Sequence, residues 1–149
     1  MVKVGIIGAG RIGRVHITSI STRVKDAVIK TVADPFLNDE TATWAKSMGV
    51  ENTTKDYKEI INDPEIDAVL ICSSTDTHSP ISLEAIKAGK HVFCEKPMAM
   101  NEDECDEMIN AAKENNVKLQ IGFMRRFDES FQEAKRMIEA GEIGEVVSV

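Results

Sequence analysis

The sequence predicts an α/β domain built on a doubly wound parallel sheet of six strands, with helices on both faces. Short apolar runs alternate with segments of helical periodicity, which is the pattern of parallel strands joined by crossover helices. The run over 68–72 is apolar throughout, as expected of a strand that is buried on both faces. The first run, 2–7, leads directly into a glycine-rich turn that opens a helical segment.

Six runs are interpreted as strands, and a further run over 146–149 is predicted to begin another strand. This last run has no later partner in the sequence, whereas domain boundaries usually fall in polar linkers. We therefore interpret residues 1–122 as one domain and 123–149 as a linking helix with the first strand of a second α/β domain, before which the chain is truncated. The six strands are expected at 2–7, 28–33, near Val50, and at 68–72, 91–94 and 118–122.

Three segments have the apolar spacing and the end signals of helices. The first is expected to have Ser79 as its N-cap and Pro80 as its first residue, and to end at Gly89. The second is capped by Asn101, and the third ends at Gly141. Their apolar faces are expected to consist of Ile81, Ala85 and Ala88; of Cys105, Met108, Ile109 and Ala112; and of Phe127, Phe131, Ala134 and Ile138.

Charge and composition restrict the class of partner. The 149 residues carry a formal net charge of −7, and the lysines and arginines are scattered rather than gathered on one stretch. This argues against nucleic acid or an anionic membrane and favours small molecules or other subunits. No run approaches the roughly 20 apolar residues that span a bilayer. The first apolar run is too short for a signal-peptide core, so we expect a cytoplasmic protein.

The cysteines, two of the histidines and the methionines are interpreted as structural. Cys72 and Cys94 each end an apolar run and have no close cysteine partner, so we expect buried free thiols in a reducing compartment. His16 and His91 have no carboxylate, cysteine or second histidine at a ligand spacing, so no metal site is predicted. The methionines are interpreted as packing residues, including Met98 and Met100.

The most specific local motif is the turn Gly8-Ala9-Gly10-Arg11-Ile12-Gly13, which follows a strand and opens a helix. With an acid about 20 residues further on, this spacing is typical of a Rossmann dinucleotide site. Gly8 permits the tight turn, Gly10 admits the pyrophosphate, and Gly13 lets the helix lie close to the strand. The free N–H groups at the helix start, including those of Arg11 and Ile12, would hold the phosphates. The alternative is a glycine-rich connection that binds nothing.

Asp34 is the acid that ends the second strand, where a carboxylate can accept hydrogen bonds from the adenosine ribose hydroxyls. A carboxylate at this position would repel a 2′-phosphate, and residues 35–38 contain no arginine or lysine to offset that repulsion. NAD is therefore predicted in preference to NADP. The alternative is a solvated acid at the start of a turn.

Two further loops follow strands at the carboxyl end of the predicted sheet, where open α/β sheets bind their ligands. Residues 73–78 offer hydroxyls, Ser73 and Thr75 among them, that could line a dinucleotide or could simply cap a helix. Glu95-Lys96-Pro97 places a lysine where it could contact a substrate hydroxyl, or where it could be part of a solvated charge pair. The residue types alone leave both pairs of alternatives open.

Three motifs in order give the chain its resemblance to a known family. They are Gly8-Ala9-Gly10-Arg11-Ile12-Gly13-Arg14-Val15-His16, then Glu95-Lys96-Pro97, then Gly122-Phe123-Met124-Arg125-Arg126-Phe127-Asp128. Together they closely resemble the Gfo/Idh/MocA oxidoreductases, and within them the inositol 2-dehydrogenases. The resemblance spans essentially the whole chain.

The resemblance implies an NAD(P)-dependent enzyme that oxidises a ring hydroxyl of a polyol or sugar, with myo-inositol as the first candidate. It makes Lys96 the catalytic lysine, Glu95 a neighbour of the nicotinamide ribose, and Pro97 a cis-proline that fixes their direction. It places Arg126 against the substrate and His78 in the cofactor loop. It also implies that the parent protein is a homo-oligomer.

The family's acid/base pair, spaced D-x-x-x-H, lies in the second domain, and no such pair occurs after Arg126 in this chain. We therefore expect the chain itself to bind cofactor without turning over substrate. One alternative is another substrate within the family, such as an aldose or an amino-sugar nucleotide. Another is a non-catalytic dinucleotide-sensing module, although a sensor has no need of an active-site lysine such as Lys96.

Overall fold

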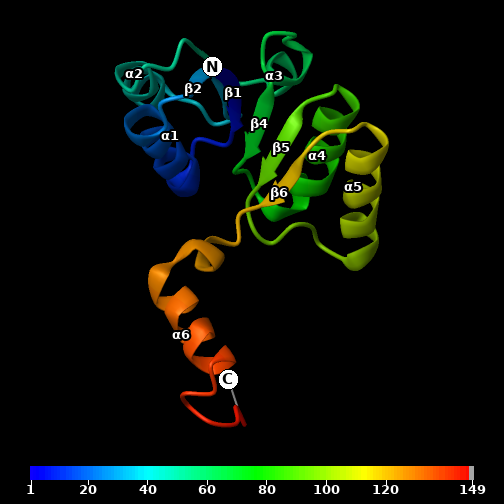
Figure 1. The fold of residues 1–149 in the computed structure, drawn as a ribbon. Coiled ribbons are helices and arrows are strands. Elements are labelled where there is room, and N and C mark those ends of the chain that lie inside the picture. The colour runs from blue at the N-terminus through cyan, green and yellow to red at the C-terminus, as the bar shows by residue number, and fades with distance from the viewer. Residues whose placement is uncertain (148–149) are drawn as a thin grey trace.

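A computed structural model, which describes residues 1–147, contains a six-stranded parallel sheet in the order β3-β2-β1-β4-β5-β6 (Figure 1). The predicted fold class is confirmed. Each of the six strands predicted for the sheet is present, with ends that differ by no more than about two residues. The strands are β1 (Val2–Ile7), β2 (Ala27–Ala33), β3 (Asn52–Thr54), β4 (Ala68–Ile71), β5 (His91–Cys94) and β6 (Leu119–Ile121).

Helices cover both faces of the sheet, and each face has its own hydrophobic cluster (Figure 1). On one face Ile17 and Ala45 pack with the apolar side chains of β1 and β2. On the other face Ile86 and Met108 pack with β4 and β5. The helices are α1 (Arg11–Arg23), α2 (Asp39–Ser47), α3 (Lys58–Asn62), α4 (His78–Lys87), α5 (Glu102–Glu114) and α6 (Glu129–Glu139), with two 3₁₀ turns, η1 (Thr75–Thr77) and η2 (Met124–Phe127).

The strand order reverses its direction between β1 and β4, which pair in parallel at the centre of the sheet. In an open α/β sheet the loops that follow two such strands diverge, one above each face, and leave a crevice at their carboxyl ends. The loop after β1 is the glycine-rich turn, and the loop after β4 is the polar segment 73–77. The topology thus brings these two predicted ligand loops together.

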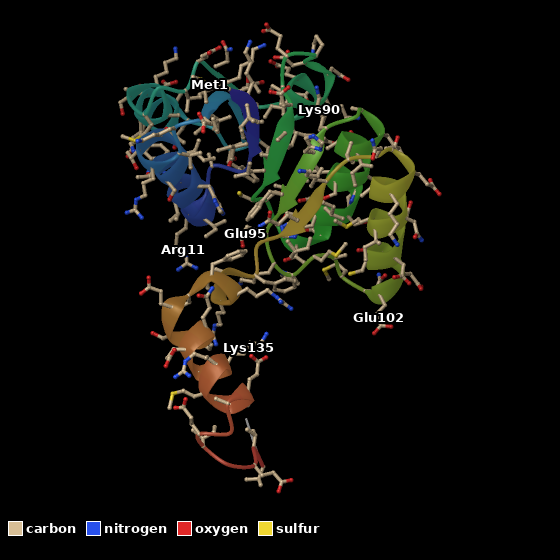
Figure 2. The ribbon with its side chains drawn as sticks, in the orientation of Figure 1. Met1, Arg11, Lys90, Glu95, Glu102 and Lys135 are labelled. Carbon is tan, nitrogen blue, oxygen red and sulfur yellow. The ribbon has the colours of Figure 1, made fainter. Side chains whose placement is uncertain are left out.

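The opposite, amino-terminal edge of the sheet is held by a buried lysine. Lys90 is 6% exposed, and its ammonium group donates to the backbone carbonyls of Asp63 and Ile66. Burial lowers the pKa of Lys90, while the charges of Asp63 and Asp67 act in the opposite direction. Figure 2 shows Lys90 at the end of the sheet remote from Glu95.

Two details of the predicted helices are wrong. Helix α4 begins at His78 and not after Ser79, because η1 leads straight into it and leaves Ser79 buried inside the first turn. Ala88 lies beyond the last helical residue and is exposed. Among the methionines, Met98 packs against the core as expected, whereas Met100 is 63% exposed because it precedes the exposed cap of α5.

Residues after β6 lead away from the sheet (Figure 1). Asp128 caps α6 by accepting hydrogen bonds from the backbone N–H groups of Ser130 and Phe131. The predicted strand is absent at Val146 and Val147, because in the described residues no strand lies beside them to pair with their backbone groups. Residues 148–149 lie outside the described part. The apolar side chains exposed on this segment are Phe123, Met124, Phe127, Phe131, Ile138, Ile143, Val146 and Val147.

The described residues, 1–147, contain no helix long and apolar enough to cross a membrane.

Candidate functional site

The glycine-rich turn has no room for side chains at two of its three glycines. Gly8 has a φ of +100°, and a Cβ atom there would lie 2.6 Å from the carbonyl oxygen of Cys72. A Cβ atom on Gly13 would lie 1.9 Å from the carbonyl oxygen of Gly8. No atom lies within 4 Å of a Cβ atom built on Gly10. The turn therefore needs Gly8 and Gly13 for its own packing, while the space over Gly10 is left open on the side where a pyrophosphate would approach.

Helix α1 begins without a cap. Its N-cap residue is Gly10, which offers no side-chain hydrogen bond, and its first turn contains no acidic residue. By contrast, Asn101 caps α5 through the backbone N–H of Glu104, and acids occupy the first turn of that helix. The N-terminal N–H groups of a helix and its dipole attract anions. The start of α1 is thus a helix end suited to the phosphates of a dinucleotide.

Asp34 is fixed in place by the turn itself. One carboxylate oxygen accepts a hydrogen bond from the N–H of Ala9 at 2.7 Å, and the other accepts from the N–H of Phe36 at 2.8 Å. Each oxygen has a further lone pair for a hydroxyl donor. The carboxylate therefore needs no rearrangement before it can accept from a ribose.

A cavity of about 590 Å³ lies beside the glycine-rich turn and Asp34. Of the residues predicted to bind cofactor, Gly8, Gly10, Asp34 and Ser73 line it. The cavity wall also includes the segment 55–57, which sequence analysis did not predict. This segment follows β3, so the rule that ligand loops follow the carboxyl ends of strands could have found it. The other lining residues are Ile7, Ala33, Pro35, Phe36, Cys72, Ser74, Thr77 and Ile81.

We expect Asp34→Ala to narrow the preference for NAD over NADP, chiefly by weakening NAD, because the ribose hydroxyls lose their charged acceptor. A hydrogen bond to a charged group contributes about 1.5–3 kcal/mol, so NAD affinity should fall by about tenfold or more. Lys55 lies on the same cavity, and its charge would favour a 2′-phosphate once the carboxylate is removed.

Calorimetric titration of both cofactors measures this preference. Asp106→Ala, which removes an exposed acid of α5 that does not line the cavity, is the matched control and should leave the preference unchanged. Tighter binding of NADP than of NAD by the unaltered chain would contradict the assignment.

A second cavity, of about 480 Å³, is lined by Lys96 and by residues 123–126. The predicted pair Lys96 and Arg126 thus share one cavity, although 30 residues separate them in the sequence. The peptide bond between Lys96 and Pro97 is cis, as expected. The predicted cofactor residues Arg11, Ile12, Gly13 and Thr75 line neither cavity.

Glu95 is held by contacts that the sequence did not reveal. His16 Nε2 lies 2.8 Å from Glu95 Oε1, and the N–H of Lys96 donates to the other carboxylate oxygen at 3.2 Å. A Cβ atom on Gly122 would lie 3.0 Å from Glu95 Oε1, so the carboxylate is also confined on that side. His16 has no carboxylate at a ligand spacing in the sequence, and the fold brings Glu95 to it from the residue after β5. Figure 2 shows Glu95 beside the start of α1, near Arg11.

His78 lies behind the cofactor loop rather than on the cavity wall. Its side chain is among the most buried in the chain, with 2% exposure. Its Nδ1 atom lies 2.7 Å from the carbonyl oxygen of Pro97, and its Nε2 atom lies 3.2 Å from that of Ser73. Both ring nitrogens are therefore engaged by protein backbone, and His78 is placed to shape the loop.

Burial keeps the two thiols nearest the site uncharged. Cys72 lines the larger cavity, and desolvation raises its pKa to about 12, with the charge of Glu95 adding to the shift. Desolvation likewise raises the pKa of Cys94 to about 11. The expectation of buried free thiols is confirmed. A neutral thiol under the turn adds no negative charge to a site that suits phosphates.

We expect Cys72 and Cys94 to react far more slowly with iodoacetamide at pH 8 than the half-buried Cys105, because the thiolate is the reacting form. Peptide mass spectrometry after timed alkylation measures each rate separately. The two slow rates should rise as the pH approaches the raised pKa values, up to the point where the fold is lost. Alkylation of Cys72 at the rate of Cys105 at pH 8 would refute this.

Within residues 1–147, no three histidine, cysteine or acidic side chains lie close enough together to hold a metal ion.

Comparison with known proteins gives consistent matches. The family model GFO_IDH_MocA, described as an oxidoreductase family with an NAD-binding Rossmann fold, matches residues 2–123. The chain is 45% identical to YrbE, an uncharacterised oxidoreductase of Bacillus subtilis, over 94% of this chain and 40% of YrbE. It is 43% identical to a myo-inositol 2-dehydrogenase of Thermotoga maritima, over 95% of this chain and 42% of that enzyme.

Among solved structures, the scyllo-inositol dehydrogenase of Lactobacillus casei with bound NAD(H) and scyllo-inositol superposes with a TM-score of 0.88. Its sequence is 35% identical, and the match covers 97% of this chain and 43% of that one. The chain therefore spans about two fifths of the length of the relatives that it matches.

Proposed function

Since the chain belongs to the Gfo/Idh/MocA oxidoreductase family and is an NAD-binding Rossmann domain, we propose that it is the cofactor half of a polyol dehydrogenase. The substrate is proposed to be a polyol or sugar ring, with myo-inositol first. One observation carries this proposal: Lys96 and Arg126 share a cavity at the same carboxyl edge of the sheet as the nucleotide cavity. The names of several relatives, which are inositol dehydrogenases, support the substrate class.

The chain's own residues would bind and orient the reactants. NAD, when bound, supplies the acceptor for the hydride that leaves the alcohol carbon. The uncapped start of α1 would hold the pyrophosphate, and Asp34 would accept from the adenosine ribose. The exposed ammonium group of Lys96 would donate a hydrogen bond to the reacting hydroxyl, and Arg126 would contact a second hydroxyl of the ring.

A base must also remove the hydroxyl proton, and none of the three histidines is placed to do so. His16 is engaged with Glu95, and His78 is buried against two carbonyls. His91 lies at the amino end of β5 and accepts from the N–H of Lys118. We therefore propose that the base lies on a part of the protein outside this chain, and that residues 123–147 lead toward it.

The test uses two proteins. One is this chain alone, and the other is a chimera in which the chain replaces the matching part of the Thermotoga maritima myo-inositol 2-dehydrogenase. We expect the chain to bind NAD without producing NADH from myo-inositol, and the chimera to produce NADH. A panel of scyllo-inositol, aldoses and amino-sugar nucleotides given to the chimera ranks the alternative substrates.

NADH absorbance reports turnover, with the Thermotoga enzyme as positive control. Turnover by the chain alone would show that the base that removes the hydroxyl proton lies within this chain, contrary to the proposal. A correctly folded chimera that binds NAD but oxidises no polyol or sugar would refute the proposed function.

A further inference from the structure

Two histidines contact the turn that carries Lys96, one on each side of the lysine. His16 in α1 contacts Glu95, which precedes Lys96, and His78 in α4 contacts Pro97, which follows it. Helix α1 begins at the glycine-rich turn, and α4 follows the loop that forms part of the nucleotide cavity wall. Each histidine therefore connects one cofactor-binding element to the lysine turn.

The contact on the Glu95 side is closely confined. The side chains of His16 and Glu95 are only 22% and 13% exposed, and their 2.8 Å contact joins positions far apart in the sequence. A carboxylate oxygen accepts, so His16 Nε2 carries the proton. The edge of the imidazole packs against Phe93, with ring centroids 5.3 Å apart. His16 thus links α1 to Glu95 and to Phe93 in β5.

On the Pro97 side the His78 ring is buried, with 2% exposure, whereas Pro97 itself is exposed. Carbonyl oxygens only accept hydrogen bonds, so a neutral His78 ring can donate to one of its two carbonyl neighbours. The shorter distance, 2.7 Å against 3.2 Å, assigns the proton to Nδ1 and the donated bond to Pro97. The opposite edge of the ring rests against Ser73, which lines the nucleotide cavity. His78 thus links the loop after β4 to the turn that carries Lys96.

We propose that His16 and His78 are positioning residues that couple occupation of the nicotinamide end of the site to the placement of Lys96. The Lys96 side chain itself is exposed, so its direction depends on the backbone that the two histidines hold. Supporting contacts of this kind decide whether a reacting group stays within the narrow range that chemistry needs. The inference rests on the proposed function in taking Lys96 as the residue that meets the substrate.

The experiment uses the 149-residue chain and two ligands. ADP-ribose contains the adenosine, both phosphates and the second ribose and lacks only the nicotinamide ring, so the ratio of its affinity to that of NAD reports the contribution of that ring. Pulse acetylation with acetic anhydride, read by peptide mass spectrometry, reports the accessibility of Lys96. In the unaltered chain NAD should slow acetylation of Lys96 and ADP-ribose should not.

The variants remove or keep one donated hydrogen bond. His16→Leu and His78→Leu remove it, whereas His16→Gln keeps a donor at the place of Nε2 and His78→Asn keeps one at the place of Nδ1. His91→Asn is the matched control, because His91 lies at the other end of the sheet. Loss of a charged or buried hydrogen bond should reduce the affinity ratio by about tenfold and abolish the protection of Lys96 by NAD.

The leucine variants should keep their ADP-ribose affinity, and the glutamine and asparagine variants should recover both readouts. Leucine variants that still show full protection of Lys96 would overturn the coupling. Equal losses of NAD and ADP-ribose affinity would also overturn it, because they indicate a general structural role. If His78→Leu does not fold, the comparison of His78→Asn with His78→Gln decides, because only asparagine retains the donor to Pro97.

The outcome is separable from that of the proposed function. Polyol oxidation by the chimera together with a Lys96 that NAD does not protect would refute the coupling alone. Protection of Lys96 in a chain whose chimera oxidises nothing would refute the polyol substrate alone.

Discussion

Replacing Gly13 with alanine should both destabilise the chain and abolish measurable NAD binding. The new Cβ atom would lie 1.9 Å from the backbone oxygen of Gly8, and a backbone atom cannot move aside as a flexible side chain can. Helix α1 must then shift away from β1. Overpacking of this kind costs about 1–3 kcal/mol, and the displaced helix start loses its contacts with the phosphates.

Gly10→Ala separates the two effects. No atom lies within 4 Å of its Cβ position, and Gly10 has a φ of −69°, which alanine adopts freely. We expect the free energy of unfolding to stay within about 0.5 kcal/mol of the unaltered chain, while NAD binding is lost because the methyl group fills the approach to the pyrophosphate.

Urea unfolding and calorimetric titration measure both quantities for both variants. A Gly10→Ala chain that binds NAD normally would show that the pyrophosphate does not pass over this turn. A Gly13→Ala chain with unchanged stability would contradict the close packing of α1 on the turn.

Replacing Lys96 with methionine should lower turnover by the chimera by about 10²–10³-fold, the usual cost of losing one hydrogen-bond donor to an oxygen that gains charge in the transition state. Methionine has nearly the length of lysine without its charge. NAD affinity should change little, because Lys96 does not line the nucleotide cavity. The loss is therefore expected in kcat.

Steady-state kinetics with myo-inositol and calorimetry with NAD measure the two effects separately. Lys87→Met is the matched control. Lys87 is exposed and is the last residue of α4, at the opposite end of that helix from the cofactor loop. A Lys96→Met chimera that retains the turnover of the control would remove Lys96 from the proposed mechanism.

The fold could be predicted because its signals are local. The strand β4 is a continuous apolar run, and the turn after β1 is recognisable from three glycines within six residues. The position of Asp34 directly after β2 could be predicted for the same reason, since its distance from the turn is set by one helix and one strand. The helix α5 follows from its Asn101 cap and its acidic first turn.

The contacts that hold the candidate site could not be predicted, because they join positions that only the sheet brings together. His16 and Glu95 are 79 residues apart, and nothing near either residue in the sequence indicates the other. The family resemblance placed His78 in the cofactor loop, but it could not indicate that the ring turns inward to carbonyl oxygens on two loops. Tertiary structure decides such pairings.

The missing cap on α1 has a consequence for the stability of the protein without its cofactor. A helix whose first N–H groups have no partner frays from that end, and a phosphate bound there would take the place of the absent cap. Ligand that binds only the folded form stabilises it by about 2.7 kcal/mol at a hundred times its Kd. Thermal denaturation can therefore serve as a ligand screen for this chain, because a ligand that binds the folded form raises the temperature of unfolding.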